Sequence, residues 1–138
     1  MPYRHVLDVP AMGSAVRIAR ETTELVLVEC GVGLRHPNVG PVLLIVAELV
    51  TNAVRHAAAA SPTITVTYAH GPGAFAFAVH DRHPWQPAPA GALGTAPGSG
   101  LAMVVEITME LGGTVVVRAD ADGRGKAIWI TPPMKPRS

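Results

Sequence analysis

The sequence predicts an α+β fold, a two-layer α/β sandwich in which helices cover one face of a mixed, mostly antiparallel sheet. Three observations lead to this prediction. The expected elements follow the order helix, helix, hairpin, loop, helix, hairpin; the strands come in consecutive pairs; and a long apolar helix needs a surface to bury it. With 138 residues and a hydrophobic content of 49%, the chain can build one core, so residues 1–138 are expected to form a single domain.

The first half of the chain predicts one short strand and two helices. Residues 5–9 have a weak strand pattern, and residues 14 to about 30 combine apolar positions with a polar side, as an amphipathic helix does. Gly31 ends that helix. Pro41 is acceptable in the first turn of a second helix, which runs to about Ala59.

The sequence pattern then changes from helix to strand. Residues 63–68 alternate between apolar and polar side chains, and residues 74–81 alternate again after a turn at residues 70–73. These two segments are expected to pair as a hairpin. Asp81 ends the second strand on the face that carries its apolar side chains.

Residues 82–100 are rich in proline and glycine, so no regular element is expected there. A loop of this length in a compact domain is usually functional, which predicts a lid over a ligand. Residues 101 to about 111 predict a third helix, residues 114–119 and 126–131 a second hairpin, and residues 132–138 a tail.

Composition and charge exclude several classes of function. A net charge of +1 argues against nucleic acid or a membrane surface as a direct partner. The single cysteine, Cys30, excludes an internal disulfide, and the six histidines lack the spacing of zinc ligands, so no zinc site is predicted. The first five residues lack the apolar core of a signal peptide, and no uncharged apolar run reaches about 18 residues. The protein is therefore expected in the cytoplasm.

A polar stripe on the second helix is the first candidate site. Leu44, Glu48, Asn52 and His56 are four residues apart, so they form one stripe on the helix. The rest of the helix is apolar on nearly every side, which predicts a buried helix. Buried carboxylate and amide groups need partners, because desolvating them without one costs about 1–3 kcal/mol each. The partner of Glu48 is either a protein group, such as Arg55 or Arg17, or a ligand.

Two further features complete a candidate purine nucleotide site. Asp81 is an acceptor suited to the amino group of adenine and unsuited to the oxygen of guanine, so the site should prefer ATP or ADP to GTP. Gly98, Ser99 and Gly100 lead directly into the helix that begins at Leu101. The unpaired N–H groups at a helix N-terminus bind phosphates, and glycine lets the backbone approach them closely.

The stripe on the second helix adds a metal ligand and a base to this site. Asn52 would donate its amide oxygen to a Mg²⁺ ion that bridges phosphates. Glu48 would orient or deprotonate an attacking hydroxyl or water. Arg55 either reaches a phosphate or forms a surface ion pair. The segment 82–100 would close over the nucleotide as a lid.

The same residues resemble the motifs of a known family. Residues 48–57 (Glu-Leu-Val-Thr-Asn-Ala-Val-Arg-His-Ala) resemble the N-box of the GHKL, or Bergerat-fold, ATPases. Residues 79–84 resemble a degenerate first glycine box, residues 98–104 the second, and residues 125–129 the final strand of small stand-alone members. The chain is most similar to the anti-sigma-factor serine kinases.

The resemblance implies the Bergerat ATP-binding fold, with ATP or ADP and Mg²⁺ as ligands. It also implies phosphorylation of a serine or threonine on a STAS-type anti-anti-sigma partner, capture of a sigma factor, and often a homodimer. Within the family pattern, Glu48 corresponds to the general base, Asn52 to the magnesium ligand and Asp81 to the adenine-binding aspartate. Gly98 and Gly100 correspond to phosphate-binding glycines.

Departures from the family pattern leave other interpretations open. His83 and Trp85 replace glycines expected after the aspartate, and Lys126 and Ala127 occupy the region of a threonine that assists adenine binding. A non-catalytic module that binds nucleotide and captures a partner is therefore the alternative to a kinase. A detached catalytic domain of a sensor histidine kinase is a third interpretation.

Overall fold

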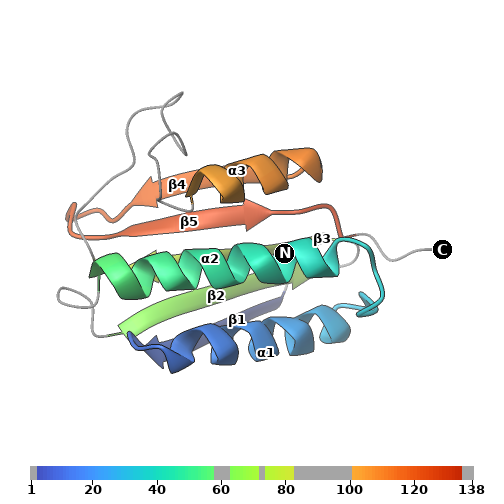
Figure 1. Cartoon of the computed structure of the whole chain (residues 1–138), viewed down its shortest axis with the longest axis horizontal. Helices are drawn as coiled ribbons and strands as arrows, with labels where there is room; N and C mark the ends of the chain where they lie inside the picture. Colours follow the sequence, from blue (N-terminus) through green and yellow to red (C-terminus); the bar gives the residue numbers. More distant parts are fainter. Residues whose placement is uncertain (1–2, 58–62, 72–73, 83–100, 135–138) are drawn as a thin grey trace.

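The computed structural model of the chain describes residues 3–57, 63–71, 74–82 and 101–134. Within these ranges it contains five strands and three helices. Their order is β1 (Tyr3–Pro10), α1 (Ser14–Glu29), α2 (Val39–Ala57), β2 (Thr63–Gly71), β3 (Ala74–Asp81), α3 (Leu101–Glu110), β4 (Thr114–Ala119) and β5 (Lys126–Thr131). The three helices lie side by side over one face of the sheet (Figure 1). The predicted two-layer α+β sandwich is confirmed.

The five strands form one sheet in the order β1-β2-β3-β5-β4. Each neighbouring pair is antiparallel. The expectation of a mixed sheet is therefore wrong for the strands that the structure describes. The physical reason is the position of β5: β3 and β4 run in the same direction, but β5 lies between them and runs opposite to both.

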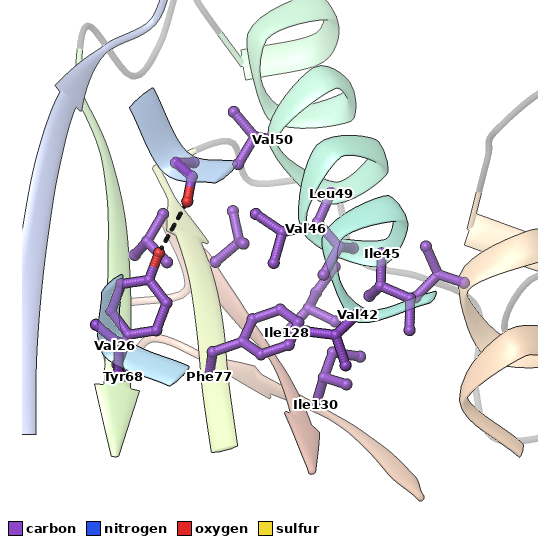
Figure 2. Close-up of a cluster of buried hydrophobic side chains, with 14 of the residues drawn as sticks. Val26, Val42, Ile45, Val46, Leu49, Val50, Tyr68, Phe77, Ile128 and Ile130 are labelled. Carbon is purple, nitrogen blue, oxygen red and sulfur yellow. Dashed lines mark hydrogen bonds between the residues drawn. The ribbon is translucent and has the colours of Figure 1, made fainter. Parts of the chain in front are cut away.

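Helix α2 occupies the middle of the helix layer, between α1 and α3 (Figure 1). One side of the helix is almost wholly removed from solvent. The side chains on that side pack over Tyr68 of β2 and Phe77 of β3 (Figure 2). Burying an aliphatic side chain of this size stabilises the fold by about 1.5–3 kcal/mol. The residues on this side are Val42, Ile45, Val46, Leu49 and Val50.

Helix α1 is fixed to the sheet by a buried polar contact as well as by apolar packing. The hydroxyl of Tyr68 lies 2.7 Å from Oγ1 of Thr23 and 3.2 Å from the carbonyl oxygen of Ala19. Thr23 also donates to the Ala19 carbonyl at 2.7 Å. Because Tyr68 is buried, its pKa rises to about 12, so the hydroxyl stays neutral.

Three segments differ in extent from the sequence-based prediction, and the first is β1, which spans Tyr3–Pro10 rather than residues 5–9. Strand β2 continues to Gly71, so His70 is a strand residue opposite Tyr3 of β1 rather than part of a turn. Residues 132–134, predicted to belong to a tail, are part of the folded structure, because Pro132 and Met134 are buried and Met134 packs in the core. Pairing with β1 and packing against the core decide these boundaries, and local sequence pattern reports neither.

None of the described helices is long and apolar enough to cross a membrane.

Candidate functional site

Three of the predicted site residues lie along the C-terminal half of α2. Glu48 and Asn52 are half-buried, one turn apart, and Arg55 is exposed. Leu44, one turn before Glu48, is 44% exposed, so the stripe is a less buried side of the helix rather than part of a fully buried one. Within the described ranges, the side chains of Glu48 and Asn52 have no hydrogen bond or ion pair. The alternative in which Glu48 pairs with an arginine is therefore wrong.

The end of the sheet nearest this half of α2 collects the other predicted elements. Helix α2 runs toward the end of the sheet where β2 begins, and in the β2–β3 register Thr65 lies opposite His80. One end of the sandwich thus holds the C-terminal end of α2, the last residues of β3, the first residues of β5 and the start of α3 (Figure 1). The predicted site is therefore built at a single end of the fold.

Asp81 ends β3 and is buried, with 5% of its surface exposed. Its register partner on β5 is Lys126, which is 6% exposed. The Lys126 ammonium donates to both carboxylate oxygens, with Nζ 3.1 Å from Oδ1 and 3.3 Å from Oδ2. A buried charge needs such a partner, because an isolated ion is strongly destabilised away from water. The residue predicted to bind adenine therefore forms a buried ion pair with the protein itself.

The end of β3 and the residue that follows it are joined to the turn between β4 and β5 by a network of hydrogen bonds and ion pairs near the surface. Nε2 of His80 lies 2.9 Å from both carboxylate oxygens of Asp120. Arg82 donates to Asp120 at 3.0 Å and to Asp122 at 2.8 Å. The hydrogen bond to Asp122 raises the pKa of Arg82, and the backbone N–H of Arg124 together with Arg82 lowers the pKa of Asp122. This network fixes Arg82, the last described residue before the predicted lid, against the turn between β4 and β5.

Gly125 allows that turn to approach β3 closely. A Cβ atom at this position would lie 2.5 Å from the backbone oxygen of Asp81 and 2.5 Å from Oδ2 of Asp120. It would also lie 3.0 Å from Cα of Arg82. No larger residue fits without moving backbone, so Gly125 sets the position of Lys126 beside Asp81.

The predicted phosphate-binding turn is only partly placed. Leu101 is the first residue of α3 and is buried in the core, at 4% exposure. Gly98, Ser99 and Gly100 lie outside the described residues, as does the predicted lid after Arg82. Their roles stay predictions.

A hollow of about 530 Å³ lies elsewhere, at the end of the sheet opposite Asp81. Phe75 at the start of β3 and Thr131 at the end of β5 line it, together with Asn38, whose amide donates to the Pro133 carbonyl at 2.7 Å. None of the residues that line it is a predicted site residue, so it is not the predicted nucleotide site.

Sequence reasoning missed the role of Lys126 as the partner of Asp81. A signal was present, because Lys126 is two residues before Ile128 and four before Ile130. The three side chains therefore share the buried face of the strand. A lysine at such a position needs an anion nearby. The His80–Asp120 contact had no comparable signal, since it depends on how two hairpins meet.

Comparison with solved structures shows the fold. Full-length ShkA in complex with AMPPNP has a TM-score of 0.58 and 22% identity over 97% of this chain, and the RsbU and RsbW domains of Rv1364c from Mycobacterium tuberculosis have 0.59 and 20% over 97%. The histidine kinase domain of the blue-light activated histidine kinase from Erythrobacter litoralis EL346 has 0.57 and 22% over 70%. The chain spans only 32%, 35% and 45% of those three structures respectively.

Sequence comparison gives the family. A comparison with curated proteins finds no match. The model of one family, described as the histidine kinase-like ATPase domain, matches residues 9–131, which run from the end of β1 to the end of β5. The chain therefore belongs to the histidine kinase-like ATPase family.

Proposed function

We propose that the protein is an ATP-binding regulator, an anti-sigma factor with serine/threonine kinase activity toward a STAS-type anti-anti-sigma partner. The observation that carries this proposal is the pair Glu48 and Asn52 on α2, at the end of the sheet where Asp81 lies. Family membership supports nucleotide binding, as does the AMPPNP of the ShkA structure. The N-box resemblance of residues 48–57 and the similarity to a structure with an RsbW domain support the regulatory role.

Asn52 fits the role of a magnesium ligand. Its amide is half-buried and has no hydrogen bond within the part of the chain that the structure describes. Amide oxygens are suitable Mg²⁺ ligands, and the ion usually keeps several waters and binds the phosphates of its nucleotide. When bound, Mg²⁺ would neutralise phosphate charge. Asn52 would therefore orient the phosphates toward α3.

Glu48 would be the general base of the phosphate transfer. It lies one turn before Asn52 and has no ion-pair partner among the described residues. A carboxylate at this place would accept the proton of the attacking serine or threonine hydroxyl of the partner. Arg55 and the backbone amides of residues 98–101 would hold phosphates.

Asp81 would recognise adenine without losing Lys126. A carboxylate offers about four lone-pair positions, so it can accept from an ammonium and an amine together. Adenine presents an amino donor beside a ring-nitrogen acceptor, so Asp81 would take the amine and Lys126 would donate to the nitrogen. Guanine presents an acceptor and a donor in the opposite order, so the proposal predicts a preference for ATP over GTP.

One observation favours a second function, a non-catalytic module that binds nucleotide and captures a partner. The Asp81–Lys126 ion pair gives the predicted adenine carboxylate a protein partner of its own. Such a pair would let the protein bind adenine, and binding by itself requires no phosphate transfer. The two functions share the adenine site and differ at Glu48.

Isothermal titration of the full chain with Mg-ATP, Mg-ADP and Mg-GTP tests the nucleotide site. The proposal expects ATP and ADP to bind and GTP to bind at least about tenfold more weakly, as one misplaced buried hydrogen bond would cause. Asn52→Ala should weaken binding in Mg²⁺ and change it little in EDTA. Absence of adenine-nucleotide binding, or a preference for GTP, contradicts the proposal.

Glu48→Ala separates the kinase from the binding module. Labelled ATP is incubated with the protein and a STAS-domain partner from the same cell, and transfer to the partner is measured. The kinase predicts that Glu48→Ala abolishes transfer and keeps ATP bound, whereas Glu24→Ala on α1 changes neither. A stable complex without transfer by the unaltered protein favours the module, and transfer to a histidine favours the sensor-kinase interpretation.

The proposal includes a cytoplasmic location, because a sigma factor is its second partner. It is compatible with a homodimer, which sedimentation of the full chain would detect. Co-purification with a sigma factor that is lost when the STAS partner is added would support the regulatory part.

A further inference from the structure

A cluster of metal-ligand side chains lies away from the predicted nucleotide site. His5 of β1, Glu29 of α1 and His70 of β2 each offer one ligand atom, and these atoms all lie within 4.8 Å of one another. Nε2 of His5 is 3.0 Å from Oε2 of Glu29. The three residues come from three different elements, so the fold alone brings them together.

The geometry of the edge of the sheet explains this meeting. The β1–β2 register places Tyr3 opposite His70, and His5, two residues on, shares the same face of the sheet. That face is the one covered by helices, since His70 continues the buried row of Ile64, Val66 and Tyr68 on β2. Helix α1 runs back along β1, so its last residue, Glu29, returns to the start of that strand.

His70 carries the observation that points to a ligand. It is 6% exposed, and its Nε2 atom is buried with no hydrogen-bond partner in the described ranges of the chain. The ring stacks with that of Tyr3, at a centroid distance of 5.2 Å, and with that of His5, at 5.4 Å with an interplanar angle of 6°. Buried polar side-chain atoms are nearly always paired, so this imidazole has binding capacity that the protein does not use.

We propose that His5, Glu29 and His70 form a binding site for a late first-row divalent cation, with Zn²⁺ as the reference ion. Two imidazoles and one carboxylate, with a water in the fourth position, are a common ligand set for zinc. Bonds of about 2.0–2.2 Å place tetrahedral ligand atoms about 3.3–3.6 Å apart. Nε2 of His5 and Oε2 of Glu29, at 3.0 Å, are a few tenths of an ångström closer than that, and their side chains are 43% and 57% exposed, so both can adjust and move toward His70.

The bound ion would join β1, an edge strand, to β2 and to the end of α1. Any ligand that binds only the folded chain stabilises it by mass action. The cluster is at the end of the sheet opposite Asp81, because His70 is near the end of β2, whereas Asp81 follows His80, which pairs with Thr65 near the start of β2. Zinc binding should therefore be independent of nucleotide binding.

The sequence-based expectation of no zinc site is revised by this proposal. That expectation rested on histidine spacing along the chain, which detects ligands carried by one helix or one loop. Here the ligands are at positions 5, 29 and 70. Strand pairing and helix packing create the cluster, and neither leaves a local spacing.

Isothermal titration of ZnCl₂ into the full chain tests the site. The proposal expects one ion per chain and a loss of affinity of roughly tenfold or more in His5→Gln, Glu29→Gln and His70→Gln, since even outer-shell groups are worth that much. His36→Gln and Glu24→Gln are the matched controls, because neither residue belongs to the cluster. Cys30→Ser, next to Glu29 in sequence, excludes binding through the thiol.

Two outcomes would overturn the proposal: no saturable zinc binding, or equal binding by the cluster variants and the controls. If His70→Gln fails to fold, Glu29→Gln still decides the question, because its side chain is more than half exposed. Thermal unfolding gives a second readout, in which zinc raises the melting temperature of the unaltered chain and not of Glu29→Gln. The increase should persist in Asp81→Asn, which replaces the carboxylate predicted to bind adenine at the other end.

Discussion

The two ends of the sheet hold a buried polar group in opposite ways. At one end the carboxylate of Asp81 lies against the ammonium of Lys126, and both residues are nearly inaccessible. At the other end the imidazole of His70 is equally buried, and its Nε2 has no partner among the described residues. An ion cannot be buried alone, so Asp81 requires a partner, whereas one buried nitrogen atom without a hydrogen bond costs about 1–3 kcal/mol. At the first end the protein itself supplies the partner of the buried group, whereas at the second end the imidazole nitrogen is left for a ligand.

Breaking the ion pair should have the largest effect on stability. Lys126→Met removes the charge that compensates buried Asp81, so we expect a loss of about 3–5 kcal/mol in the free energy of unfolding. The double variant Asp81→Asn with Lys126→Met should recover most of that loss, since no charge is then buried. Urea unfolding of the single and double variants measures both. Additive losses would show that the two residues act independently.

Tyr68 is an intermediate case, a buried polar group satisfied while neutral. Burial raises its pKa from 10.0 to about 12 in the folded chain. The folded state thus favours the protonated hydroxyl, and the stability this gives is fully present below about pH 10 and is lost as the pH rises toward about 12. The shift corresponds to roughly 3 kcal/mol at about 1.4 kcal/mol per unit. The free energy of unfolding, measured between these pH values, should fall with pH in the unaltered chain and not in Tyr68→Phe. The same dependence on pH in both would assign it to another group.

Gly125→Ala tests the packing that holds the charged end together. Its Cβ would lie 2.5 Å from the backbone oxygen of Asp81, so β5 or the end of β3 must move. Overpacking of this kind costs about 1–3 kcal/mol. Gly33→Ala is the control, because a Cβ there meets no atom within 4 Å. Equal stability of the two variants, measured by urea unfolding, would show that the turn yields without cost.

His70→Phe should have the smallest effect at the other end, and with the opposite sign. In metal-free buffer it removes a buried nitrogen that has no partner among the described residues and keeps a ring that can stack with Tyr3 and His5, so we expect a gain of about 1 kcal/mol. His5→Phe, at a more exposed position, should stay within about 0.5 kcal/mol of the unaltered chain. Chemical unfolding in EDTA compares them. A clear loss in His70→Phe would mean that the nitrogen has a partner or that the larger ring does not fit.

Local sequence pattern gave a good account of the elements. The hairpin strand β4 and the strand β5 have the expected bounds, because alternation and turn residues act over a few neighbours. The helix α3 begins at Leu101 as expected, and Gly112, with a φ of 83°, follows its end. The pattern could not report that β5 lies between β3 and β4, since pairing order depends on contacts between distant residues.

The sequence by itself determined the composition of the candidate nucleotide site. The spacing of Glu48 and Asn52 places them on one side of a helix wherever that helix packs, and the family match requires only the residues in order. Asp81 was placed at the end of a strand by the alternation before it. These properties are local, so no knowledge of the fold was needed.

Only the tertiary structure decided which charges and ligands meet. Lys126 reaches Asp81 because β5 pairs with β3, and His5, Glu29 and His70 meet because β1 pairs with β2 while α1 returns over them. These residues are separated by tens of positions along the chain, and closing such a loop leaves no local signature. The physical reason is that burial and partner choice are properties of the packed core, in which each side chain is placed by contacts from several elements at once.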